Sequence, residues 1–121
     1  MIAGIGIDVT ELGRIKDAIA KHPQFAQHVL TPVELKQYQQ FHGQRAIEYL
    51  GGRWSLKESF SKAMGTGIGR TVNFQNVEII DQANGRPVVT KSPFDGRVHV
   101  SVSHTDKIVM TEVLLEEKID R

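Results

Sequence analysis

Asp8 and Glu58 are far apart in this sequence, yet each is placed where a carboxylate could act on a ligand. Asp8 ends an alternating segment, residues 2–9, and Glu58 lies in a long predicted helix. Mg²⁺ in proteins usually takes one or two carboxylates together with water and substrate phosphate oxygens. The two residues could therefore meet at one magnesium ion. Each also has an ordinary interpretation, Asp8 as a helix-capping residue and Glu58 as a solvated helix residue.

Several cations lie in the same predicted helix as Glu58. Arg53 and Lys57 are four residues apart, and so are Glu58 and Lys62, which makes the members of each pair neighbours on a helix. Glu58 and Lys62 could form an ordinary surface ion pair. Arg53 and Lys57 repel each other mildly, and a bound anion would relieve that repulsion. A phosphate beside this helix is therefore one interpretation of the pattern.

A glycine-rich turn and a histidine could also bind phosphate. The segment Gly65–Gly69 would expose backbone N–H groups to an anion. It follows a helix and lacks the ending of a P-loop, so a helix cap and turn is the simpler interpretation. His104, near a strand end, could donate to a phosphate, accept a proton, or serve only as a turn residue. The other histidines lack metal-binding spacing, so we expect no zinc site; they are His22, His28, His42 and His99.

Periodicity predicts one strand, a block of helices and then β-hairpins. Residues 2–9 alternate between an apolar face and a nearly bare face that carries two glycines and Asp8. The bare face would let another group approach closely. Helical spacing follows from about Glu11 to Ala20, in a short piece near 25–30, from Thr31 to about Phe41, and from Gln44 to Met64. Strands are expected at 73–81, 87–91, 98–103 and 108–116.

Local signals support these boundaries. Thr31 and Glu34 form a capping-box pattern with Pro32 in the first turn, and Gly65 is a natural C-terminal cap. Ala83–Arg86 is a hairpin turn signal. Gly51 and Gly52 interrupt the long helix and predict either close packing or a kink. The expected class is α+β: a single domain, residues 1–121, whose N-terminal strand and antiparallel hairpins form a sheet covered on one face by helices.

Composition narrows the functional classes. The formal net charge is +1, from 15 Lys and Arg against 14 Asp and Glu, and aromatics make up 7% of the chain. A basic excess and stacking aromatics are typical of nucleic-acid binding, so we expect no such partner. No apolar run approaches the ~20 residues that span a bilayer, and the N-terminus lacks a signal-peptide pattern. The absence of Cys is compatible with the cytoplasmic, membrane-free protein that we expect.

Taken together, these blocks resemble the short class of 4′-phosphopantetheinyl transferases, the holo-(acyl-carrier-protein) synthases. Order and spacing match over essentially the full length. The blocks that carry the resemblance are Gly4-Ile5-Gly6-Ile7-Asp8 with Glu11 and Arg14-Ile15, Arg53 with Lys57-Glu58, Phe60 to Gly69, and Val100-Ser101-Val102-Ser103-His104-Thr105.

The resemblance implies a phosphoryl-type transfer in fatty acid biosynthesis. A serine hydroxyl of apo acyl carrier protein attacks the β-phosphate of coenzyme A, which yields the phosphopantetheinylated carrier and adenosine 3′,5′-bisphosphate. Asp8 and Glu58 would hold Mg²⁺. The resemblance also implies a homotrimer with active sites between subunits, so Arg45 and Arg53 could come from a different subunit than Asp8.

The other site residues follow from the same resemblance. Catalytic roles fall on His104 and Lys62. Coenzyme A contacts are expected from Arg45, Arg53, Lys57, Lys62, Gly65, Thr66 and His104, with Asn84, Gly85, Arg86 and Pro87 bordering the adenine. Arg14 and Lys21 are the basic contacts expected for an acidic helix of the carrier protein.

Two departures from the family pattern stand out. Ser59 replaces a usual alanine, and residues 107–111 replace an aromatic residue and small alanines. The base that deprotonates the serine stays open among Glu58, Glu34, His104 and a metal-bound water. Two rival functions also stay open: a Mg²⁺-dependent pyrophosphohydrolase without a protein acceptor, and a non-catalytic module that binds nucleic acid or a partner.

Overall fold

The chain folds into strands and helices in the predicted order. The computed structural model describes residues 1–119, and within them the class is α+β, as predicted. In chain order the elements are β1 (Ile2–Glu11), α1 (Leu12–Lys21), α2 (Phe25–Val29), α3 (Pro32–Tyr38), α4 (Gly43–Met64), β2 (Glu78–Asp81), β3 (Pro87–Lys91), β4 (Gly96–His104) and β5 (Ile108–Glu117).

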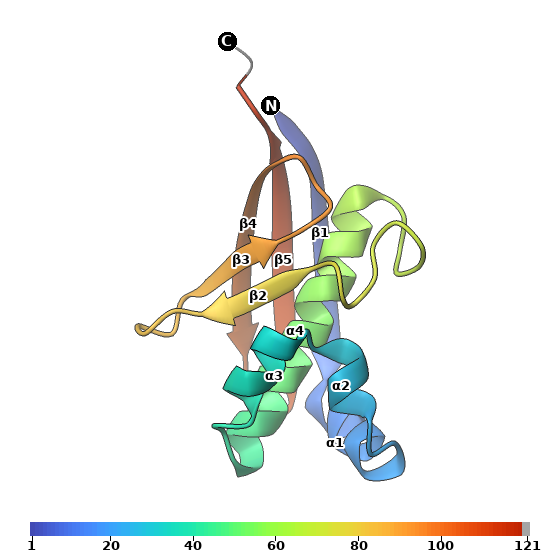
Figure 1. Ribbon diagram of the computed structural model, residues 1–121, viewed down its shortest axis with the longest axis vertical. Helices are drawn as coiled ribbons and strands as arrows, with labels where there is room; N and C mark the ends of the chain where they lie inside the picture. The colour runs from blue at the N-terminus through green and yellow to red at the C-terminus, as the bar shows by residue number, and fades with distance from the viewer. Residues whose placement is uncertain (120–121) are drawn as a thin grey trace.

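The strands form two separate antiparallel sheets rather than the one sheet expected. The larger sheet has the order β1-β5-β4, and the β2–β3 hairpin makes a sheet of its own. Figure 1 shows this hairpin crossing in front of the larger sheet, with α4 running alongside and the shorter helices at one end. In the larger sheet Asp8 lies opposite Thr111, and His104 lies opposite Val109. The register therefore places two predicted site residues on the two outer strands.

The bare face of β1 is covered by the long helix. A side-chain carbon added at Gly4 would overlap the Ala63 carbonyl oxygen, and one added at Gly6 would overlap that of Ser59. Glycine at both positions is what lets α4 lie directly on the strand. The close approach predicted for this face is thus made by the chain itself, and it fixes the helix relative to Asp8.

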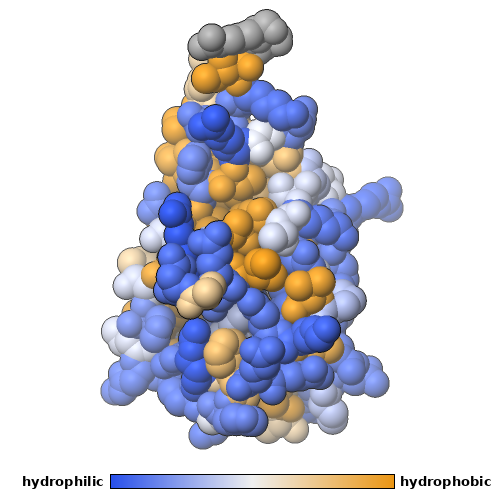
Figure 2. Space-filling view, turned by 60° about the vertical axis from the view of Figure 1, so that its left-hand side comes forward, coloured by the Kyte–Doolittle hydropathy of each residue, from blue (hydrophilic) through white to orange (hydrophobic). Residues whose placement is uncertain are grey.

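The other face of β1 is exposed in the single chain. The side chains of Ile5, Ile7 and Val9 keep more than half of their surface exposed, and Met110 on β5 keeps 49%. Figure 2 shows apolar side chains reaching the surface among hydrophilic ones on one side of the molecule. A contiguous apolar surface on a sheet is typical of a protein interface.

Two boundaries differ from the predictions, and the first has a clear local reason. The strand expected from residue 73 begins only at Glu78, because the side chains of Asn73 and Asn76 accept hydrogen bonds from nearby backbone N–H groups. Such bonds favour a turn over a sheet ladder. The helix begun by Thr31 ends at Tyr38 rather than Phe41.

The predicted caps are present. Thr31 and the Glu34 side chain form the reciprocal capping box, and Gly65 closes α4 with a φ of +76°. The two glycines inside α4 leave it unbroken. Gly51 packs against Leu12, whereas Gly52 is open on its side-chain side. The predicted close packing is therefore found at Gly51 and not at Gly52.

The long helix also organises the core. One buried cluster joins Leu56 and Phe60 of α4 to Val113 of β5, and a second joins Leu50 to Ile15 of α1. No helix in the described residues is both long and apolar enough to cross a membrane.

Candidate active site

Asp8 and Glu58, the two predicted metal ligands, line the same cavity. This cavity has a volume of about 360 Å³, and Arg14 and Trp54 line it as well. Asp8 comes from β1, Glu58 from α4, and Arg14 from α1. The glycine-mediated packing of α4 on β1 is what brings the two carboxylates together.

The two carboxylate oxygens of Asp8 have different partners. Oδ2 accepts hydrogen bonds from the hydroxyls of Thr10, at 2.6 Å, and Ser55, at 2.8 Å. Oδ1 lies 3.3 Å from the Nζ of Lys62, whose ammonium also donates to the Ile7 carbonyl at 3.0 Å. Lys62 therefore lies beside the acidic pair.

Electrostatics of the pair fit a divalent cation. Partial burial raises the pKa of Glu58, and the neighbouring Asp8 carboxylate raises it further, while Lys62 opposes the shift. Two like charges held together favour a bound cation between them. Within residues 1–119 no third His, Asp or Glu joins them to complete a metal cluster. Two carboxylates, with the remaining positions left to water and phosphate, are a donor set suited to Mg²⁺.

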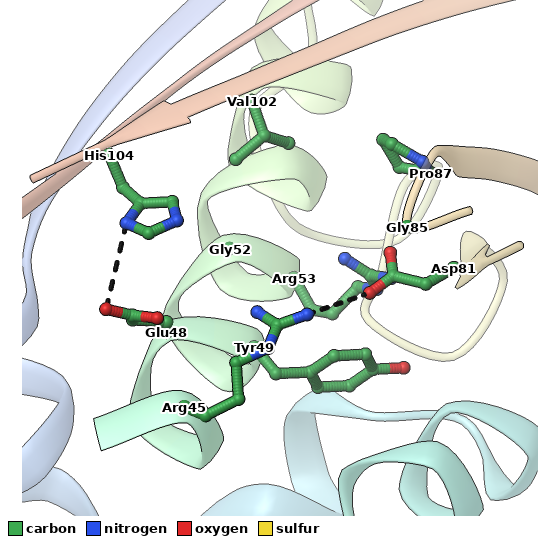
Figure 3. Close-up of a pocket in the computed structure, with 10 residues that line it drawn as sticks. All are labelled: Arg45, Glu48, Tyr49, Gly52, Arg53, Asp81, Gly85, Pro87, Val102 and His104. Carbon is green, nitrogen blue, oxygen red and sulfur yellow. Dashed lines mark hydrogen bonds and ion pairs between the residues drawn. The ribbon is translucent and has the colours of Figure 1, made fainter. Parts of the chain in front are cut away.

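A second cavity, of about 440 Å³, gathers the other predicted ligand contacts. Figure 3 shows Arg45 and Arg53 from α4, His104 from the end of β4, and Gly85 and Pro87 from the β2–β3 hairpin around it. Two arginines, a histidine and an open backbone turn are the groups that hold phosphate and a planar base. This cavity can thus accommodate a nucleotide-like ligand.

The arginines of this second cavity are held in place by one acid. Arg53 Nη2 lies 2.6 Å from Asp81 Oδ1, and Arg45 Nη2 lies 3.6 Å from Asp81 Oδ2. Arg53 is nearly buried, with Nε donating to the Ile79 carbonyl and its guanidinium over the Tyr49 ring. Arg45 keeps 48% of its side chain exposed, so it is the arginine free to reach an anion.

Two further groups complete the second cavity. His104 Nδ1 lies 3.8 Å from Glu48 Oε2, drawn as a dashed line in Figure 3. Burial raises the pKa of Tyr49 to about 12, so its hydroxyl stays protonated near neutral pH. That hydroxyl donates to the Gln37 side chain at 2.8 Å, which ties α4 to α3.

The two cavities open on different sides of α4. They share no lining residue. Gly52 lines one and Glu58 the other, and a separation of six positions along a helix corresponds to a rotation of about 120° around its axis. In one chain the acidic pair and the arginine cavity therefore do not face the same space.

The structure corrects the prediction for Lys57. Its side chain is fully buried, and Nζ donates to the carbonyls of Val29 and Phe74 and to the carboxylate of Glu34. Burial lowers the pKa of Lys57, and the Glu34 carboxylate opposes that shift. The repulsion between Lys57 and Arg53 is thus relieved by two carboxylates of the chain itself, Glu34 and Asp81, and not by a ligand.

Glu34 is corrected as well. It is fully buried, and its two carboxylate oxygens accept from Lys57, from the backbone N–H of Thr31 and from that of Ile79. A carboxylate enclosed in this way cannot reach a serine of another protein. The candidates for the base are therefore reduced to groups at the two cavities.

The remaining predicted residues line neither of these cavities. Gly65 and Thr66 form the turn after α4, with their N–H groups directed at helix carbonyls. Asn84 accepts from the backbone of Arg86 within the hairpin turn, and Arg86 lines a separate, smaller hollow near β4. Lys21 is exposed in the last turn of α1, on the helix that also carries Arg14.

Sequence reasoning missed residues that contact the site. They are Thr10, Ser55 and Trp54 near the acidic pair, and Glu48, Tyr49 and Asp81 in the arginine cavity. Thr10 carried a usable signal, because a hydroxyl two residues after a strand-end acid can reach it. Ser55 and Asp81 carried none, since their partners are distant in sequence.

Known proteins with similar sequences identify the family of this chain. The sequence model of the 4′-phosphopantetheinyl transferase superfamily matches residues 4–114, which is most of the chain. The chain belongs to this superfamily. It is accordingly a transferase, and the rival interpretation as a non-catalytic binding module falls away.

Curated relatives within the superfamily are similar over nearly their whole length. A holo-(acyl-carrier-protein) synthase of Limosilactobacillus reuteri is 64% identical over 118 residues, which cover 98% of each chain. One of Levilactobacillus brevis is 57% identical over 116 residues, with 96% of this chain and 95% of the relative covered.

Solved structures of the same superfamily share the fold. A holo-(acyl-carrier-protein) synthase of Bacillus anthracis, in complex with CoA (3′,5′-ADP), superposes with a TM-score of 0.91 at 38% identity, covering 98% of this chain and 99% of its own. One from Neisseria meningitidis gives a TM-score of 0.88 at 36% identity, covering 97% and 100%. The transferase fold predicted from the sequence is therefore confirmed.

Proposed function

We propose that this chain transfers the 4′-phosphopantetheine group of coenzyme A to a serine of an apo acyl carrier protein, in support of fatty acid biosynthesis. The observation that carries the proposal is the meeting of Asp8 and Glu58 in one cavity, in a chain of this superfamily. The coenzyme A bound to the Bacillus anthracis relative supports the choice of donor. The absence of Cys agrees with action in the cytoplasm.

The reaction balances as a displacement at phosphorus. The serine oxygen forms a bond to the β-phosphorus of coenzyme A while the bond to the bridging pyrophosphate oxygen breaks. The carrier gains phosphopantetheine, adenosine 3′,5′-bisphosphate leaves, and the serine proton passes to a base. Positioning and charge stabilisation supply most of the catalysis in such transfers.

The acidic pair would hold Mg²⁺. When bound, this ion supplies Lewis-acid stabilisation and a template for phosphate oxygens. Lys62 adds a positive charge on the same side, because its ammonium lies between the Ile7 carbonyl and Asp8 Oδ1. A phosphate oxygen near Asp8 would be within reach of that ammonium, which orients the pyrophosphate.

The second cavity would hold the nucleotide end of coenzyme A. Arg45 is exposed enough to pair with a phosphate, and His104 can donate to one. Gly85 and Pro87 line this cavity and would border the adenine, as expected from the resemblance. Lys57 takes no part in this site, since it is enclosed in the core.

Assembly into a homotrimer would bring the two cavities together. In one chain they open on different sides of α4, so one ligand cannot use both. A cyclic arrangement places one surface of each copy against a different surface of the next. The exposed apolar side chains of Ile5, Ile7 and Val9 give such an assembly a surface to bury.

The carrier protein would bind along α1. Arg14 lines the cavity of the acidic pair, and Lys21 follows two helical turns later on the same face. An acidic helix laid across them would bring its serine close to Asp8. Because such pairing acts mainly on association rate, it should weaken as salt increases.

Intact-mass measurement tests the proposed transfer. The protein is incubated with coenzyme A, Mg²⁺ and an apo acyl carrier protein, and the carrier is weighed before and after. We expect a gain of one phosphopantetheine that is lost when Mg²⁺ is replaced by a chelator. The matched control is a carrier whose acceptor serine is changed to alanine.

Two results would contradict the proposal. One is an unchanged mass for every bacterial apo carrier supplied. The other is release of adenosine 3′,5′-bisphosphate at the same rate with and without a carrier, which would support the rival pyrophosphohydrolase instead.

A further inference from the structure

A chain of buried hydroxyl groups leads from the interior of the protein to Asp8. The Ser55 hydroxyl, which donates to Asp8 Oδ2, lies 2.8 Å from the Thr111 hydroxyl. The Thr111 hydroxyl in turn lies 2.7 Å from that of Ser59. All three residues are at most 1% exposed, so their hydroxyls cannot be satisfied by bulk water.

The elements that carry these hydroxyls meet behind Asp8. Ser55 and Ser59 are one turn apart on α4, and Thr111 lies on β5 opposite Asp8 in the strand register. These hydrogen-bonded hydroxyls therefore link α4 to both β1 and β5 at one point. Ser59 and Thr111 also lie at the two places where this sequence departs from the family pattern. This row of hydroxyls therefore depends on residues that differ from the usual ones.

Proton positions in the chain follow from the charge at its end. An ionised carboxylate can only accept, so the Ser55 proton points to Asp8. The Ser55 oxygen then offers only lone pairs to Thr111, so Thr111 donates to Ser55. The Thr111 proton is then committed to Ser55, so at the 2.7 Å contact Ser59 donates to the Thr111 hydroxyl, and it also lies 3.2 Å from the Thr111 carbonyl oxygen. Each hydroxyl donates toward Asp8, and Ser55 and Thr111 each accept from the next hydroxyl inward, an order in which each bond polarises and strengthens its neighbour.

The two oxygens of the Asp8 carboxylate therefore have unequal numbers of hydrogen-bond donors. Oδ2 holds two hydroxyl donors, Thr10 and Ser55, both within 2.8 Å. Oδ1 has only the half-exposed Lys62 at 3.3 Å among the described residues. The carboxylate is thereby held in one rotation, with Oδ1 left for a ligand from outside.

We propose that Ser55 is a positioning residue, which together with Thr111 and Ser59 fixes Asp8 so that Oδ1 faces a bound divalent cation. Hydrogen bonds to a metal-binding carboxylate orient the ligand and raise affinity for the metal. The inference rests on the proposed function, in which Asp8 and Glu58 hold that cation. It adds the source of the orientation.

Binding of Mn²⁺ in the presence of coenzyme A tests this role. Mn²⁺ replaces Mg²⁺ at oxygen sites, and its free form is counted by electron paramagnetic resonance. For Ser55→Ala we expect the Kd for Mn²⁺ to rise roughly tenfold, the low end for loss of such a bond. For Thr111→Val, which keeps the side-chain volume, we expect a rise of about threefold, since Ser55 keeps its bond but loses its support.

Matched controls separate positioning from packing. Thr111→Ser restores the hydroxyl and should bring the Kd back to within about twofold of the unmodified chain. Ser61→Ala removes another buried serine of α4, one that donates only to the Glu58 backbone carbonyl. It should lower the melting temperature as Ser55→Ala does, and leave the Kd for Mn²⁺ unchanged. Turnover at saturating Mg²⁺ should stay within about twofold for Ser61→Ala, whereas Ser55→Ala and Thr111→Val should need more Mg²⁺ to reach half of their maximal turnover.

The outcomes are distinguishable. If Ser55→Ala and Thr111→Val bind Mn²⁺ as tightly as the unmodified chain, the positioning role is wrong while the metal site stands. If the unmodified chain itself binds no Mn²⁺ with coenzyme A present, the proposed metal pair is wrong and the positioning role falls with it.

Discussion

Replacing Asp8 by Asn or Glu58 by Gln should lower the rate of phosphopantetheine transfer by roughly 10²–10³-fold. A bound metal ion supplies several kcal/mol of charge stabilisation in phosphoryl-type transfers, and each ~1.4 kcal/mol corresponds to a tenfold change in rate. Both substitutions keep the size of the side chain and remove its charge. The measurement is kcat/KM from the intact mass of the carrier at several times in the reaction.

The fold should survive these changes, because both side chains line a cavity rather than the core. Circular dichroism of each variant checks this. Asp17→Asn, on the exposed surface of α1, is the matched control and should leave the rate within about twofold, as for ordinary surface substitutions. Wild-type rates in both the Asp8 and the Glu58 variant would refute the metal assignment.

Mixing two inactive variants should restore activity. Glu58→Gln damages the acidic cavity, and His104→Ala damages the arginine cavity, so each alone is expected to be nearly inactive. In a cyclic trimer that contains both variants, one of the three interfaces joins an intact acidic cavity to an intact arginine cavity, which predicts about one third of full activity. The two variants are co-expressed with different tags, and assemblies that carry both tags are purified and assayed.

The control for this experiment is a mixture of two Glu58→Gln chains with different tags, which should stay inactive. A doubly tagged assembly without regained activity would place both halves of the site in one chain. Failure to form any doubly tagged assembly would contradict the proposed trimer itself.

The parts of the fold that sequence predicted are those specified by nearby residues. Alternation in residues 2–9 predicts β1, the Thr31 capping box predicts the start of α3, and Gly65 predicts the end of α4. The two glycines of β1 predicted a close approach. What approaches is α4, and periodicity could not name it because that contact is long-range.

In the site, too, local patterns were predictable and long-range contacts were not. Asp8 and Glu58 each had an ordinary interpretation, and only the set of motifs placed them together. Lys57 was misjudged, because its spacing from Arg53 is that of a surface pair, while its partner Glu34 lies on a different helix. A buried ion pair of this kind depends on how α3 packs against α4, which no local pattern encodes. Ser55 was missed for the same reason.

The decisive measurement is the position of the divalent cation in a crystal. Crystals grown with coenzyme A and Mn²⁺ would show the ion through its anomalous scattering. We predict a single strong peak between the carboxylates of Asp8 and Glu58, with Asp8 Oδ1 as the nearer oxygen of that residue. A peak elsewhere, with these two carboxylates pointing to separate places, would contradict it.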